Sequence, residues 1–188
     1  ELQDINYGNA GSNGGPGGAN GDWKHFNAVA YNEDLDQIAL SSRFHDEIYI
    51  IDHSTTTEEA AGHTGGNSGM GGDFLYRWGN PHSYNRGGDL DRVLDDQHSV
   101  NWIPEGYPGE GNLILFNNNY GSNSAVFEIV TPINEDGTYS ISPGQPYGPI
   151  EPIWIHTGPF HTQMQGGAFR LPNGNTLITD CNDATIFE

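Results

Sequence analysis

Three histidines occupy matching places in this sequence, and an imidazole in such a place can serve as a nucleophile, a proton carrier or a metal ligand. His98 and His161 each stand 14 residues before the turn that opens a short apolar run, and the count for His25 is 11. Each of them alone fits a surface turn or a hydrogen-bonded structural side chain. Three at one phase of a repeated pattern predict a shared site. The turns are at Asn112, Asn175 and Asp36, respectively.

The number of residues from each histidine to the apolar anchor of its strand sets the register of the first two histidines and not that of the third. His25 and His98 each lie four residues before an apolar anchor of their strand, whereas the same count back from Phe169 reaches Gln165 and not His161. The register of the third histidine is therefore the weakest part of the pattern.

The spacing gives less support to other chemistries. Zinc ligands recur at short intervals, whereas the sequence contains neither His-x-His nor His-x-x-x-His and has one cysteine, Cys181. No EF-hand glycine pattern surrounds the acidic pairs that could offer oxygens to calcium, so solvated loops are the simpler interpretation. Serine-nucleophile and phosphate-loop signatures are absent. We therefore predict no metal ion and no cofactor. The acidic pairs are 34–36, 89–91 and 95–96.

The elements that must position the histidines are short apolar runs separated by turn residues. These runs have the length of strands and are rich in β-branched and aromatic residues, and none shows the period of an amphipathic helix over the length that a helix needs. The sequence therefore predicts an all-β fold. The clearest runs are 28–31, 38–40, 48–51 and 74–78.

The apolar runs recur as a unit, in which a turn leads into an apolar strand and then into a strand with an acidic residue. Two units close with a tryptophan strand, 76–78 and 152–154. Four strands per unit, repeated radially, predict the blades of a β-propeller, whereas a β-sandwich gives no reason for the recurrence. We expect about three blades, the third without its outermost strand, in a piece of a longer chain. The first strands of the units would line one channel. The units begin at Asp36, Gly111 and Gly174, and their acidic residues are Glu47, Glu128 and Glu188.

Two stretches lack strand patterning. Residues 1–22 contain a glycine-rich run and predict a loop or linker, so the partial propeller domain covers 23–188. Residues 54–72 are rich in Gly and Thr and predict an excursion between strands, with a short helical turn at 58–61 that Thr57 would cap.

Charge excludes several classes of partner. The chain carries 6 basic and 25 acidic residues, a net charge of −19, so its field repels nucleic acid and anionic membrane surfaces. No apolar stretch approaches the ~18 residues of a spanning helix, which argues against membrane insertion. The acidity favours an exported protein.

Seven motifs of the sequence form a specific combination. They lie at 22–27, 40–43, 47–57, 62–69, 76–81, 97–98 and 170–178. Together they resemble the motifs of the bacterial arylsulfate sulfotransferases. The resemblance runs from about Asp22 to Glu188 and implies a six-bladed propeller in the periplasm or outside the cell. It also implies transfer of a sulfuryl group from a phenolic sulfate ester to a phenol acceptor, through a transient sulfohistidine and without a nucleotide sulfate donor.

The resemblance also implies roles for particular side chains. Histidines would react with the ester, and Asn and Arg side chains would hold the sulfuryl oxygens. His161 is the expected nucleophile, because the two earlier histidines share more regular inner-strand positions that suit fixed donors. The predicted catalytic residues are His25, His98 and His161, and the predicted substrate-binding residues are Asn27, Arg43 and Asn118.

One departure from the family pattern supports a different function. Ser122 stands where the family often has an active-site arginine. Losing one donor from a site that stabilises an oxyanion typically costs ~10²–10³ in rate. The alternative hypothesis is a catalytically inactive secreted propeller that binds a ligand or serves the fold alone.

Overall fold

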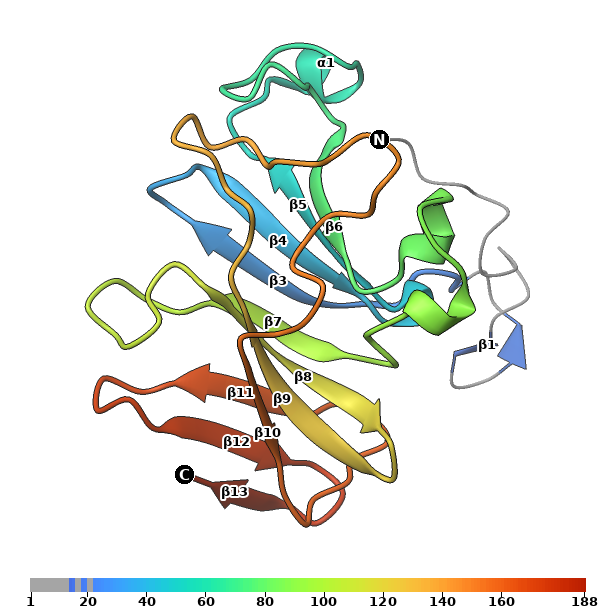
Figure 1. The fold of residues 1–188 in the computed structure, drawn as a ribbon, viewed down its shortest axis with the longest axis vertical. Helices are drawn as coiled ribbons and strands as arrows, with labels where there is room; N and C mark the ends of the chain where they lie inside the picture. The colour runs from blue at the N-terminus through green and yellow to red at the C-terminus, as the bar shows by residue number, and fades with distance from the viewer. Residues whose placement is uncertain (1–13, 16–17, 20–21) are drawn as a thin grey trace.

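The computed structural model describes residues 14–15, 18–19 and 22–188, and within them the protein is all-β, as predicted (Figure 1). The described strands form three antiparallel sheets of four, four and three strands, and β1 and β2 form a separate two-stranded pair. Most of the predicted linker 1–22 lies outside the described residues. No helix in the described part of the chain is long and apolar enough to cross a membrane.

Each of the three sheets is a meander, in which neighbouring strands follow one another along the chain. The first contains β3 (Phe26–Asn32), β4 (Gln37–Ser42), β5 (Glu47–Asp52) and β6 (Phe74–Trp78). The second contains β7 (His98–Trp102), β8 (Leu113–Tyr120), β9 (Asn123–Ile129) and β10 (Trp154–Thr157). The third contains β11 (Gly167–Arg170), β12 (Thr176–Asp180) and β13 (Thr185–Phe187). The short pair is β1 (Gly14–Gly15) and β2 (Gly18–Ala19).

The repeated unit of the sequence corresponds to two consecutive strands in each sheet. Its apolar strands are β4, β8 and β12, and the strands that follow them are β5, β9 and β13. Glu47 and Glu128 lie in β5 and β9 as predicted, whereas β13 ends at Phe187, one residue before Glu188. The tight turn between β8 and β9 needs Gly121 at a φ of +65°. The last strand of the second sheet starts at Trp154 and not at Pro152 as predicted, since proline has no N–H to donate to a ladder.

The excursion at 54–72 is confirmed, because it contains no strand. Its helical turn, α1 (Thr57–Ala60), is capped by Thr56 and not by Thr57. The Thr56 hydroxyl accepts the backbone N–H of Glu59, and the Glu59 carboxylate accepts the N–H of Thr56. This reciprocal capping box requires an acidic residue three positions after the cap, which Thr56 has in Glu59 and Thr57 lacks, because residue 60 is alanine. Three 3₁₀ turns complete the connections: η1 (Arg43–His45), η2 (Pro81–Tyr84) and η3 (Asp89–Asp91).

The second sheet lies between the other two, and β8 is buried on both faces. Leu113 and Leu115 join the core shared with the first sheet, while Ile114 and Phe116 join the core shared with the third. This division follows from the two-residue period of a strand. At one edge of this stack β7 contacts both β3 and β11 (Figure 1). The first strands of the three sheets are therefore neighbours.

A buried ion pair joins β5 to β6 in the first sheet. Nε and Nη2 of Arg77 donate to the two carboxylate oxygens of Glu47 at 3.0 and 2.8 Å, and both side chains are fully buried. The Tyr49 hydroxyl also donates to Glu47, at 2.9 Å. In the second sheet the equivalent acidic residue, Glu128, accepts a hydrogen bond from Nη2 of Arg170. The recurring acidic position therefore holds a guanidinium in two of the three units.

We predict that Glu47→Leu destabilises the protein by about 3–5 kcal/mol, because Arg77 is then a buried charge without its anion. Urea denaturation followed by tryptophan fluorescence measures the change. The double variant Glu47→Leu/Arg77→Met should recover most of the loss, and the exposed Glu58→Ala should be nearly neutral. A single variant as stable as the wild type would show that the pair does not hold β5 to β6.

Candidate functional site

A cleft of about 510 Å³ lies where the first strands of the three sheets meet, and we call it the inner cleft. It contains two of the six predicted site residues, Asn27 and His98. A larger pocket of about 800 Å³ lies between β6, η3 and the segment that leads into β10, and contains none of the six. The inner cleft is therefore the candidate site. It is lined by residues 27–30, 98–101, 165–167, Phe169 and Thr179.

His98 opens β7 and lies buried at the wall of the inner cleft. Its Nδ1–H donates to Oδ1 of Asn118 at 2.8 Å and to the backbone oxygen of Asp96 at 2.9 Å. Both partners are acceptors, so Nδ1 carries the proton and Nε2 carries the lone pair. Nε2 accepts the backbone N–H of Gln165 at 3.3 Å. Burial lowers the pKa of His98, and the charge of Arg43 lowers it as well, so the ring is a neutral imidazole at neutral pH.

Asn118 lies fully buried in β8, behind the ring of His98. Its amide Nδ2 donates to the backbone oxygens of Thr162 and Gln165, at 2.9 and 2.7 Å. The sequence predicted that Asn118 binds substrate. In the structure the amide group bonds to protein atoms on both sides, and its contact with the inner cleft is made through His98.

Arg43 and His98 are linked through one residue, Asp96. Nη2 of Arg43 donates to the Asp96 carboxylate at 2.8 Å, and the backbone oxygen of Asp96 accepts the Nδ1–H of His98. Asp96 adopts a left-handed φ of +58°, a conformation that costs free energy in a residue with a Cβ. The first and second sheets thus bring a guanidinium and an imidazole to the same short segment.

His25 precedes β3 at the end of a turn that Asp22 closes. One Asp22 oxygen accepts the backbone N–H of His25 at 3.0 Å, and the other lies 2.5 Å from its Nδ1. The His25 ring packs against Phe44, with centroids 4.8 Å apart. The backbone N–H of Arg43 donates to the His25 carbonyl at 3.2 Å. His25 and Arg43 are therefore held side by side.

Two of the predicted binding residues carry buried polar atoms that no described residue satisfies: Oδ1 of Asn27 and Nε of Arg43. An unsatisfied buried polar group costs free energy, so such atoms mark places where a ligand can complete the hydrogen bonding. The Arg43 Nε–H would donate to an oxyanion, and Asn27 Oδ1 would accept from a hydroxyl. The other end of the Asn27 amide is fixed, since Nδ2 donates to the Gln97 backbone oxygen at 2.7 Å.

His161 and Ser122 do not line the inner cleft. His161 is exposed in the segment between β10 and β11, where its backbone oxygen accepts a hydrogen bond from Nδ2 of Asn182. Ser122 is exposed in the turn between β8 and β9. The structure thus brings His98, Asn118 and Asn27 together, with His25 and Arg43 on the adjoining segment, and leaves His161 apart.

Three residues that contribute to the site were given no role in it from the sequence: Asp96, Gln97 and Gln165. Gln97 is fully buried, and its Nε2 donates to backbone oxygens of Ser42 and Glu47, which docks the second sheet on the first. A signal for Gln165 existed, because the count back from Phe169 reached it. The loop that carries its N–H to His98 has no strand pattern, so the contact itself could not be predicted.

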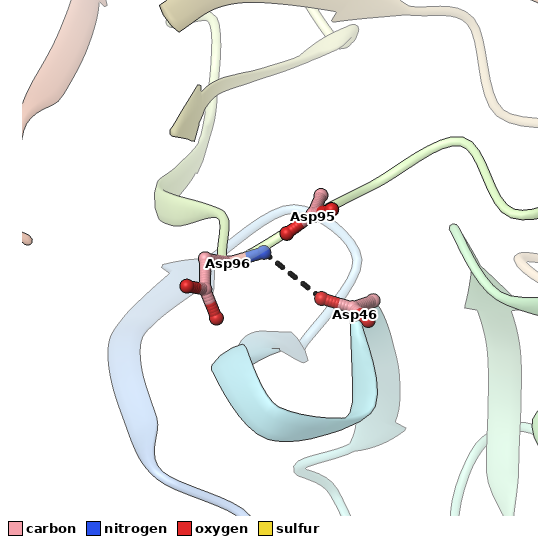
Figure 2. A group of neighbouring side chains, drawn as sticks. All are labelled: Asp46, Asp95 and Asp96. Atoms are coloured by element: carbon pink, nitrogen blue, oxygen red, sulfur yellow. Dashed lines mark hydrogen bonds between the residues drawn. The ribbon is translucent and has the colours of Figure 1, made fainter. Parts of the chain in front are cut away.

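Asp46, Asp95 and Asp96 form an acidic cluster beside the site, with carboxylate oxygens within 4.8 Å of one another (Figure 2). Protein donors engage these oxygens. The Asp96 N–H donates to Asp46 at 2.9 Å, Arg92 donates to Asp46 and Asp95, and Asn119 donates to Asp95 at 2.9 Å. The cluster therefore ties η1 to the segment before β7. The sequence predicted solvated loops at Asp95-Asp96 and did not anticipate Asp46.

The family model described as Arylsulfotransferase (ASST) matches residues 6–140, which is more than half of the chain. The matched stretch includes five of the six predicted site residues and ends before His161. A comparison with curated proteins finds no match.

The acidic cluster predicts a pH dependence of stability. Burial raises the pKa of Asp46 from 3.8 to about 6 against the opposing effect of Arg92. Between these two values the folded protein holds a proton that the unfolded chain releases, so Asp46 makes stability fall as pH rises from about 4 to 6. Asp46→Asn should remove this component.

Urea denaturation at pH 4, 5, 6 and 7 measures the free energy of unfolding of both proteins. The variant should gain on the wild type as pH rises through this window, while the exposed Asp34→Asn should not. A difference that does not vary with pH would contradict the raised pKa.

Proposed function

The chain belongs to the arylsulfotransferase family, and we propose that it transfers a sulfuryl group from a phenolic sulfate ester to a phenol acceptor through a sulfohistidine, without a nucleotide sulfate donor. The observation that carries this proposal is the state of His98. Its Nδ1 donates to two oxygens, its burial lowers the pKa of the ring, and it lines the inner cleft. An imidazole attacks sulfur through an unprotonated nitrogen, and Nε2 of His98 is such a nitrogen. Its lone pair accepts the Gln165 N–H at 3.3 Å, so the attack requires this hydrogen bond to open.

We assign the nucleophilic role to His98 in place of the expected His161. His161 is exposed and does not line the inner cleft, and it lies beyond the stretch that matches the family model. A nucleophile in a shielded cleft acts where fixed donors are most effective, because the local dielectric constant is low.

The transfer divides into two balanced steps. Nε2 of His98 attacks the sulfur of the donor ester, the N–S bond forms, and the S–O bond to the aromatic ring breaks with its electron pair leaving as phenolate. Phenol has a pKa of ~10, which makes the phenolate a fair leaving group. The acceptor phenol gives up its proton, through solvent, to the phenolate released in the first step. It then attacks the same sulfur as a phenolate, and the electron pair of the N–S bond returns to Nε2.

Arg43, Asn27 and His25 are the groups that we propose for the sulfuryl and phenolic oxygens. The Nε–H of Arg43 lies outside the lining of the inner cleft and has no hydrogen-bond partner among the described residues, and we propose that it donates to a sulfuryl oxygen. Oδ1 of Asn27, which lines the cleft, can accept from a phenol hydroxyl. Fixed donors of this kind stabilise negative charge without reorganising during the reaction. Ser122 stands where the family often has an active-site arginine. In this proposal Arg43 supplies a guanidinium in its place.

The proposal extends to a six-bladed β-propeller in the periplasm or outside the cell. Two observations support the architecture: each sheet is a meander, and β3, β7 and β11 meet at one edge. The net charge of −19 supports an exported protein and opposes nucleic acid as a partner. A small phenolic ester and a phenol are the proposed partners.

Mixing the protein with an activated aryl sulfate and measuring its intact mass tests the function. We expect a sulfuryl adduct on the wild type, transfer of that group to an added phenol, and loss of both in His98→Ala. His161→Ala should form the adduct as the wild type does.

The outcomes separate the hypotheses. An adduct that survives His98→Ala and disappears in His161→Ala would return the nucleophile to His161. A wild type that forms no adduct, where an active arylsulfotransferase forms one under the same conditions, would favour the inactive propeller.

A further inference from the structure

We propose that Asn118 is a positioning residue for His98, which fixes the tautomer and orientation of the ring, and that it does not bind the sulfate ester. This inference rests on the proposed function for its catalytic meaning. The geometry behind it involves only protein atoms: the His98 ring, the Asn118 amide and the loop that leads into β11.

The orientation of the Asn118 amide is fixed by three hydrogen bonds. Nδ2 donates to the backbone oxygens of Thr162 and Gln165, and Oδ1 accepts from His98. Reversing the amide would place its oxygen against two carbonyl oxygens, and full burial leaves no water to compensate. The side-chain oxygen of Asn118, Oδ1, must therefore face the ring of His98.

A fixed acceptor facing Nδ1 determines the tautomer of His98. The proton has to reside on Nδ1, since an unprotonated Nδ1 would oppose its lone pair to the oxygens of both Asn118 and Asp96. Free histidine in water favours the opposite tautomer, with the proton on Nε2. The two oxygens thus impose the form in which Nε2 is the nucleophile.

Asn118 also holds the element that contacts the other side of the ring. Its Nδ2 bonds to the Gln165 carbonyl, and the Gln165 N–H donates to Nε2 of His98 at 3.3 Å. The Ser124 hydroxyl supports the same loop, because it donates to the Asn118 carbonyl and accepts the N–H of Thr162. One buried amide therefore fixes both the ring and the loop beside it.

The same contact has a role in the transition state. When Nε2 bonds to sulfur the ring becomes positively charged, and Nδ1 keeps its proton throughout. Oxygens of Asn118 and Asp96 that accept this N–H stabilise the charge as it develops, as acceptors behind a reacting imidazole generally do. Removing such a partner typically costs ~10–100-fold in activity.

The test compares three variants of the ¹⁵N-histidine-labelled protein. Asn118→Ala removes the acceptor, Asn118→Asp keeps it, and Asn117→Ala is the matched control. Asn117 is the buried neighbour in β8, and its amide bonds to the backbone of Asp95 and Val93 and not to His98. His98→Gln identifies the His98 resonances. Two quantities are measured: the ring ¹⁵N shifts of His98, and the rate of sulfuryl labelling by an activated aryl sulfate.

We expect the wild type and Asn117→Ala to show a protonated Nδ1 and an unprotonated Nε2. In Asn118→Ala the Asp96 carbonyl remains at Nδ1, while the second acceptor and the bond to the Gln165 loop are lost, so the ring shifts should move toward a mixture of tautomers and labelling should be ~10–100-fold slower. Asn118→Asp keeps an oxygen facing Nδ1, so the proton should stay on Nδ1 with its resonance displaced by the carboxylate. Its second oxygen opposes the Thr162 and Gln165 carbonyls, so the labelling rate should lie between those of the wild type and Asn118→Ala.

Unchanged His98 shifts in Asn118→Ala would overturn the proposal, whatever the rate does. If Asn118→Ala fails to fold, the isosteric Asn118→Asp decides alone: an Nδ1 resonance identical to that of the wild type would equally overturn the proposal. If the wild type forms no sulfuryl adduct, the proposed function fails, while the ring shifts still decide whether Asn118 sets the tautomer.

Discussion

Buried side-chain amides hold the three sheets together at the edge where the inner cleft lies, and the site depends on this constraint. Gln97 docks the second sheet on backbone oxygens of the first, and Asn101 reaches the Ala168 carbonyl of the third. Asn118 holds the loop before β11. A buried amide that loses its partner costs far more than a hydrogen bond between exposed groups contributes. The bonds that these amides donate therefore fix the relative position of the sheets, while Oδ1 of Asn27 and Oε1 of Gln97 have no hydrogen-bond partner among the described residues.

The groups around His98 bear on how an acidic protein could bind the anionic ester of the proposed reaction. The chain carries a net charge of −19, yet a sulfate ester is an anion. Around His98 the nearby carboxylate of Asp96 is paired with Arg43, and burial keeps the imidazole neutral. Screening over ~8 Å at physiological ionic strength limits the reach of the remaining surface charge. The pairing of Asp96 with Arg43 and the uncharged ring of His98 thus reduce the repulsion that the anionic ester of the proposed reaction would meet at the inner cleft.

Much of the fold could be predicted from the sequence, because strand period and turn residues are local signals. The recurrence beginning at Asp36, Gly111 and Gly174 located the central strands of all three sheets. The same signals failed where two choices are nearly equivalent locally. Thr56 and Thr57 are adjacent candidates for one cap, and only the reciprocal bond with Glu59 distinguishes them. His161 lies outside the inner cleft, and its register could not be set from the sequence, since the loop before β11 has no period.

The residue types of the candidate site could be predicted from the sequence, whereas the hydrogen bonds between them could not. His98 and Asn27 belong to recognisable motifs and line one cleft, whereas the contact of His98 with Asn118 joins residues 20 positions apart on neighbouring strands. Which nitrogen of a ring is protonated depends on such contacts alone.

The most direct test of this account is a crystal structure of the protein after reaction with an activated aryl sulfate. The account predicts a sulfuryl group bonded to Nε2 of His98, with Nδ1 still donating to Asn118. A sulfuryl group on His25 or His161, beside an unmodified His98, would contradict it.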